Sequence, residues 1–349
     1  MKMKIFSLCV LSLLGHTLSA YASFEGLEQE KLKKSSIVSF TRPCCGFSRS
    51  FFTKTLRLTK YIDSSKLGAH SYNRSGEGDK VGILYSCNGG FIDVSHLRDN
   101  ADWAAHILFN LPTWLGSGQE VPVRNEDGFT KRSVLFPKFT AEELKSLTAE
   151  DKEKISISVG FSMALLHEIA TAFNIQGASS FSVEDAYSNL LGSYLGVKAA
   201  TGPLPYNKEL TNVLDSTISD LGGLSKDETK LVHKSVMNTW WKGSLFGRYT
   251  TVLKRDMSFE GDVVPFMVNH SACQNVAPVA LEIPKVLSNG KQVNDYYQVQ
   301  AELNESTIKG LNKYGADVGK TISQHDFPKM VEAIRAKLIK SFGEDVDHQ

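Results

Sequence analysis

Apolar residues recur every three or four positions over much of the chain, which predicts a protein built mainly from helices. This helical spacing covers residues 155–175, 183–197, 208–221, 227–241 and 321–342. Short apolar runs at 81–85 and 249–268 are typical of strands, and turn residues between short β-type runs over 112–139 predict a hairpin. We therefore expect an α+β fold, mainly helical, in which a helical core carries the functional site and short strands lie at its periphery.

Start signals divide the central helical region. T-A-E-E at 140–143 and T-A-E-D at 148–151 are consecutive capping boxes, in which a Thr hydroxyl and an acid three residues later satisfy free helix N–H groups. They predict a short helix followed by the long one. A further helix is expected to start at Asp93 or Ser95 and to run to Leu111.

His167 and Glu168 are adjacent on the predicted helix at 155–175, and Glu184 and Asp185 open the next one. Residues three, four and seven apart share a helix face. The faces of His167 and Asp185 are small or polar, so two helices crossing there can approach closely and bring His167 opposite Asp185 or Glu184. Such an arrangement is typical of a metal site or an acid–base pair. The remaining residues of the two faces are Gly160, Met163, Ala164 and Thr171 on the first, and Ser188, Asn189, Gly192 and Gly196 on the second.

The same acids also fit a purely structural interpretation. S-V-E-D at 182–185 is a capping box, and a carboxylate at a helix start complements the helix dipole. A buried His beside a Glu can likewise be a structural pair. Spacing alone leaves both interpretations open.

A second stretch rich in reactive side chains covers residues 88–103. On a helix through it, His96, Asn100 and Trp103 share a face, while Arg98 and Asp102 are spaced as an i,i+4 ion pair. The structural alternative is an N-capped surface helix with one salt bridge. His96 is nevertheless a candidate ligand.

The N-terminus has the features of a secretory signal peptide over residues 1–22. Two Lys residues precede an apolar run at 5–18, and A-Y-A at 20–22 is a small-x-small cleavage signal. We expect the mature chain to be one domain over 23–349, with a loose polar leader at about 23–40 and a polar C-terminal tail. It would be periplasmic or secreted rather than cytoplasmic, and no segment after the signal has the roughly 18 apolar residues of a membrane span.

Charge and cysteine content refine this expectation. The 39 basic and 38 acidic residues give a net charge of +1, which does not indicate nucleic acid as a partner. Signal removal would leave four cysteines in an oxidising compartment, which predicts at least one disulfide. Because adjacent cysteines rarely pair with each other, we expect Cys44 and Cys45 to reach Cys87 and Cys273, in either order, rather than a thiolate zinc site.

Several stretches together resemble the exported bacterial proteins grouped as domain of unknown function 4056. They are R-P-C-C-G-F at 42–47, G-G-F-I-D-V-S-H-L-R-D-N-A-D at 89–102, H-E-I-A-T at 167–171, F-S-V-E-D-A-Y-S-N-L-L-G at 181–192 and K-R-D-M-S-F-E-G-D-V-V-P-F at 254–266. The resemblance covers most of the mature chain. It implies an exported bacterial protein and no particular activity.

The same helices also resemble those of gluzincin metallopeptidases, whose first helix bears His-Glu-x-x-His and whose second bears an acidic ligand. D-A-Y-S-N-L-L-G at 185–192 looks like the thermolysin-type second helix, and this match places Asp185 at the metal-ligand position. The chain departs from the pattern at Thr171, which stands where the second His would be, and His167 and Asp185 are closer in sequence than usual. A further ligand must therefore come from elsewhere, and His96 is the natural one.

These observations favour a zinc-dependent hydrolase acting on an unidentified substrate, which the resemblance suggests is a peptide or amide. His96, His167 and Asp185 or Glu184 would hold the metal, and Glu168 would be the general base. The residues expected to surround these groups are Asp93, Arg98, Asp102, Thr171 and Asn189.

Two other classes remain open. The chain could be a non-catalytic envelope or secreted interaction protein in which His167, Glu168, Arg98 and Asp102 form a buried structural network, since buried charges must be paired. It could also be a metal-free glycosidase using Glu168 and Glu184, although no aromatic-rich sugar cleft is evident.

Overall fold

The computed structural model describes residues 42, 61–73, 78–123, 128–173, 179–243, 250–343 and 346. The expected signal peptide and leader, together with Cys44 and Cys45, lie outside the described residues. Within those residues the fold is α+β and mainly helical, which confirms the class predicted from the sequence.

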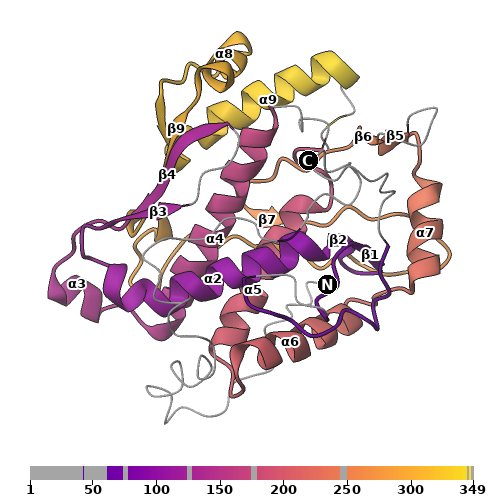
Figure 1. Ribbon diagram of the computed structural model, residues 1–349, viewed down its shortest axis with the longest axis horizontal. Coiled ribbons are helices and arrows are strands. Elements are labelled where there is room, and N and C mark those ends of the chain that lie inside the picture. The colour runs from indigo at the N-terminus through magenta and orange to yellow at the C-terminus, as the bar shows by residue number, and fades with distance from the viewer. Residues whose placement is uncertain are drawn as a thin grey trace.

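Four helices pack together, three in the centre of the molecule and the last below them in the view of Figure 1. They are α2 (Val94–Trp114), α4 (Ala149–Thr171), α5 (Asp185–Ala200) and α6 (Tyr206–Asp220). Helix α2 packs against both α4 and α5, and α5 also packs against α6. Capping boxes start α3 (Ala141–Lys145) at Thr140 and α4 at Thr148, as the sequence predicts.

Helices α2 and α5 touch almost backbone to backbone, and glycine makes this possible. A Cβ added at Gly192 would lie 2.2 Å from the carbonyl oxygen of Leu97, and one at Gly196 would lie 2.1 Å from that of Ala101. The small face of α5 was expected to meet the helix of His167. Its two glycines meet α2 instead, whereas Gly160 of α4 faces Ser193 and Ala104.

A four-stranded antiparallel sheet packs beside α4, with strand order β10-β9-β4-β3. The predicted hairpin supplies β3 (Glu120–Val123) and β4 (Phe129–Leu135). The other two strands, β9 (Gln298–Leu303) and β10 (Thr321–Ser323), come from the C-terminal part of the chain, as do α8 (Glu305–Lys313) and α9 (Phe327–Phe342). The helix predicted at 321–342 thus starts later than expected, because its first residues form β10 and the 3-10 turn Gln324–Asp326.

Three two-stranded sheets complete the described part of the chain, and helix α7 (Lys226–Ser235) packs beside the first of them. The strands pair as β1 (Ile83–Ser86) with β2 (Gly90–Asp93), β5 (Trp241–Gly243) with β6 (Thr250–Val252), and β7 (Asp262–Val263) with β8 (Leu281–Glu282). A 3-10 turn, Val293–Asp295, precedes β9. Within the described ranges, no helix combines the length and apolar character that crossing a membrane requires.

One disulfide joins Cys87 to Cys273, with 5.1 Å between their Cα atoms. The prediction of at least one disulfide is confirmed. The expected pairing of these two cysteines with Cys44 and Cys45 is wrong, because the chain brings the loop after β1 against the turn at 270–273, where Cys87 and Cys273 meet.

Candidate metal centre

His96, Glu168 and Asp185 converge from three different helices, α2, α4 and α5. Each offers one ligand atom, and these three atoms lie within 4.8 Å of one another. The side chains are buried, with residue exposures of 1%, 5% and 4%. One imidazole and two carboxylates are a donor set that zinc and other divalent ions accept.

His96 is fixed at the start of α2. Asp93 caps this helix by accepting hydrogen bonds from the backbone N–H groups of Ser95 and His96. The imidazole Nδ1 lies 3.0 Å from Asn189 Oδ1, and Nε2 lies 3.6 Å from Asp185 Oδ1. Asp93 and Asn189, both expected to support a ligand histidine, therefore lie around His96.

The two carboxylate oxygens of Asp185 have different partners, one at the start of α5 and one in the candidate site. Its Oδ2 accepts a hydrogen bond from the backbone N–H of Ser182 at 3.0 Å, while Oδ1 faces His96. Only half of the expected capping box is present, because the Ser182 hydroxyl donates to Glu184 Oε2 rather than accepting from a helix N–H. Capping and metal binding are thus compatible functions of this carboxylate.

Glu168 lies among the candidate ligand atoms rather than at their border. Its Oε2 accepts a 2.7 Å hydrogen bond from the backbone N–H of Phe181. Phe181 has a φ of 57°, in the left-handed region that bulky residues rarely adopt, and its carbonyl accepts from the Asp256 N–H. The chain is thus held in an unfavourable conformation where it orients Glu168.

His167 is buried near this group but is not one of its three members. Its ring centroid lies 6.1 Å from that of His96, with the two planes tilted by 56°. Because adjacent helix residues point about 100° apart, Glu168 and His167 cannot face one point equally. Thr171 is turned to its own helix and donates to the Glu168 carbonyl.

Glu184 and Arg255 add two further buried ionisable side chains to the site. Burial raises the pKa of Glu184 to about 8, and the negative charge of Asp93 adds to this shift. The hydrogen bond from the Ser182 hydroxyl opposes it. Burial lowers the pKa of Arg255 to about 10, although the nearby charges of Asp185, Glu168 and Glu184 oppose this shift. Because its pKa lies above neutral pH, Glu184 is mostly protonated in the absence of a cation. Glu168, Asp185 and Arg255 then carry a formal charge of −1, which favours a bound cation.

Sequence reasoning missed Arg255. This residue comes from the strand-rich stretch after β6, more than fifty residues from the other members, and its side chain donates to the carbonyls of Ser180 and Val252. The isolated bridge that pairs Ser182 with Arg255 places it here. The only signal was a basic residue inside an apolar run.

A small pocket adjoins Glu168, with room for about one water molecule. Glu168, Asn189 and Asp256 supply its charged and amide groups. The other lining residues are Phe161, Leu165, Phe181, Ala186 and Ser258. The candidate site therefore has one side on which a water molecule can lie against a carboxylate.

Residues 34–269 match the sequence profile of a family described as "Protein of unknown function (DUF4056)". The chain belongs to this family. All three members of the candidate metal group, as well as Arg255, lie within the DUF4056 match, whereas β9, β10, α8 and α9 follow it. No curated protein and no solved structure matches the chain.

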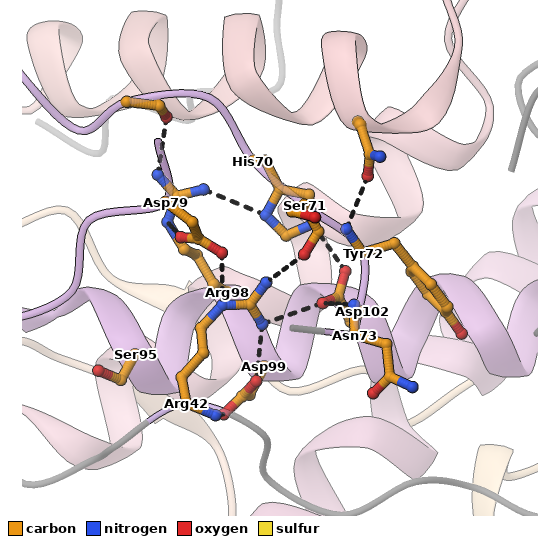
Figure 2. Close-up of polar contacts among 12 residues, drawn as sticks. Arg42, His70, Ser71, Tyr72, Asn73, Asp79, Ser95, Arg98, Asp99 and Asp102 are labelled. Atoms are coloured by element: carbon orange, nitrogen blue, oxygen red, sulfur yellow. Dashed lines mark hydrogen bonds and ion pairs between the residues drawn. The ribbon is translucent and has the colours of Figure 1, made fainter. Parts of the chain in front are cut away.

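The DUF4056 region also holds a buried ionic cluster on the side of α2 that carries Arg98, Asp99 and Asp102 (Figure 2). Arg42 contacts three carboxylates: Asp79 at 2.9 Å, Asp99 at 2.7 Å and Asp102 at 3.0 Å. These contacts hold Arg42 against α2.

Arg98 and Asp102 do not form the predicted i,i+4 ion pair. Arg98 pairs with Asp79 at 2.9 Å, and Asp102 binds Arg42 and His70. His70 connects the two, since its ring nitrogens lie 3.1 Å from Arg98 Nη1 and 2.8 Å from Asp102 Oδ1. Both residues were also expected near the site or in one network with His167 and Glu168. They lie on another face of α2 because Arg98 is two positions, about 200°, from His96.

Proposed function

We propose that this protein is an exported metal-dependent hydrolase whose metal, zinc in the simplest case, is held by His96, Glu168 and Asp185. The observation that carries the proposal is the convergence of one imidazole and two carboxylates, buried and within 4.8 Å of one another. Three protein ligands and one open position are typical of catalytic zinc sites. The net negative formal charge of Glu168, Asp185 and Arg255 supports a cation at this point.

The metal would lower the pKa of a bound water toward 7 and so supply a nucleophile at neutral pH. With Glu168 among the ligand atoms, another group has to accept the proton. Asp256 lines the pocket beside Glu168, and its Oδ1 is held by the Ser258 N–H at 3.0 Å. We assign the general base to Asp256, and the open fourth position of the metal to the water. A peptide or amide substrate rests on the likeness of the two helices to gluzincins.

Metal analysis of the purified mature protein tests the proposal. We expect about one equivalent of zinc, lost in His96→Ala and Glu168→Gln. Matched controls are His325→Ala, an exposed histidine, and Glu150→Gln, an exposed acid on the same helix as Glu168. Folded protein that binds no divalent ion after exposure to zinc, manganese and iron would refute it.

The burial of the site favours one alternative, a non-catalytic interaction protein. His96, Glu168 and Asp185 are each at most 5% exposed, and Arg255 is fully buried among their charges. In that case the four groups would be a structural network, and buried charges of this kind are stable when paired. Metal analysis distinguishes the two functions, because the structural network would form without any metal.

A further inference from the structure

We propose that Asn100 and Asn189 are positioning residues that keep the ring proton of His96 on Nδ1, so that Nε2 presents its lone pair to a metal ion. This inference rests on the proposed metal site. It concerns the chain's own proton arrangement and can be measured without a metal.

The arrangement begins at the backbone carbonyl of His96, which can only accept hydrogen bonds. Four residues later on α2, the side chain of Asn100 lies with its amide nitrogen 3.0 Å from this oxygen. A reversed amide would place two oxygens against each other. The orientation of Asn100 is therefore fixed by the helix that carries it.

The same amide nitrogen has a second hydrogen, which points to α5. It lies 2.5 Å from Asn189 Oδ1. Because Asn100 donates, Asn189 has to present its oxygen. A reversed Asn189 would set two donors against each other.

Asn189 Oδ1 is also the atom that faces His96 Nδ1, at 3.0 Å. An amide oxygen accepts and cannot donate, so Nδ1 has to carry the proton. In a neutral imidazole the other nitrogen, Nε2, is then the acceptor. Nε2 is the atom that faces Asp185 Oδ1 across 3.6 Å, a gap between two electron-pair donors that suits a cation.

Burial makes this proton arrangement compulsory. His96, Asn100 and Asn189 are 1%, 0% and 2% exposed, so bulk water does not compete for their polar atoms. Asn100 Oδ1 has no hydrogen-bond partner in the part of the chain that the structure describes. Both N–H groups of the Asn100 amide are thus hydrogen-bonded while its oxygen is not. This is expected if the N–H groups are what orients the site.

Nitrogen NMR of the histidine rings in chelator-treated, metal-free protein at pH 8 tests the inference directly. We expect His96 to show a protonated Nδ1 and a bare Nε2. A proton on Nε2 with Nδ1 bare, in the folded wild-type protein, would overturn it.

Asn100→Asp is the sharpest variant, because it replaces the amide donor with an acceptor of the same shape. Asn189 should then turn its own amide nitrogen toward the new carboxylate and toward His96, which moves the ring proton to Nε2. Asn110→Asp is the matched control, since Asn110 makes the same i−4 bond to His106 on the same helix. A folded Asn100→Asp protein with the wild-type ring pattern would contradict the inference.

Asn189→Asp supplies a variant that keeps the acceptor. It should leave the proton on Nδ1, and it remains informative if Asn100→Asp does not fold. Loss of that proton would count against the proposal.

Zinc titration by chelator competition separates this inference from the proposed function. We expect Asn100→Asp to weaken zinc binding about 10- to 100-fold, the usual effect of changing a group that orients a ligand histidine, with no change in Asn110→Asp. If wild-type protein shows the expected ring pattern but binds no zinc, the proposed function fails and the proton arrangement stands.

Discussion

His233 lies flat against Trp241, with ring centroids 3.6 Å apart and planes within 10°, and its Nδ1 is hydrogen-bonded to the Tyr61 hydroxyl. Burial lowers the pKa of His233 to about 3, from about 6.5 in an unfolded chain. The unfolded chain therefore takes up this proton first. The contribution of His233 to stability is complete above about pH 6.5 and is lost as the pH falls toward 3.

Replacing His233 with Phe should remove this dependence while keeping a ring against Trp241. Between pH 7.5 and 5, wild-type protein should lose about 2 kcal/mol more unfolding free energy than His233→Phe, at about 1.4 kcal/mol per pH unit. Urea unfolding at both values measures the difference. His325→Phe, at an exposed position, should behave as wild type. Equal pH dependence in wild type and His233→Phe would show that His233 binds a proton as readily in the folded protein as in the unfolded chain.

The members of the candidate metal group were only partly predictable. His96 and Asp185 followed from helix faces and from the likeness of two helices, and both lie in the group. The sequence did not indicate whether His167 or Glu168 would point into the metal group. Residues all around α4 are buried, so its apolar pattern does not indicate one inward direction. Arg255 was unpredictable because no periodicity connects it with the other members.

The helix crossing of α2 and α5 places two of the three ligand residues, and it tolerates no side chain at Gly192. In Gly192→Ala, the new Cβ would lie 2.2 Å from the backbone of Leu97, beside His96. The helices must separate, so we expect a loss of roughly 1–3 kcal/mol or more in unfolding free energy, with weaker zinc binding.

Two other alanines calibrate this measurement. At Gly160 the nearest atom would be Ser193 Oγ at 3.0 Å, so a smaller loss is expected. At Gly319 nothing lies within 4 Å, and the change should be nearly neutral. If Gly192→Ala lost as little unfolding free energy as Gly319→Ala, the close crossing of α2 and α5 would be disproved.

Local signals predicted the elements that depend on neighbouring residues. Capping at Thr140 and Thr148, and the hairpin of β3 and β4, have partners within a few positions. Strand β9 pairs with β4 across more than 160 residues, so nothing near either strand indicates the pairing. The polar–apolar alternation of Q-V-Q-A-E-L at 298–303 is typical of a strand, but it does not indicate which strand is the partner.

The Cys87–Cys273 bond joins positions 186 residues apart. In the chain-entropy model, closing a loop of this length stabilises the folded protein by about 5 kcal/mol. We expect Cys273→Ser to lower the unfolding free energy by a large part of this amount. Reducing agent should lower wild-type stability similarly and leave the variant unchanged. If reductant shifts both proteins equally, the bond is not the cause.

The same bond turns much of the molecule into a covalent ring. Residues 88–272 lie inside it, among them His96, Glu168, Asp185 and Arg255, whereas β9, α8, β10 and α9 lie outside. A protease that cuts one peptide bond within the ring leaves two pieces that are still joined through sulfur. Every member of the candidate metal group then stays attached to the others, and only a reductant can release them.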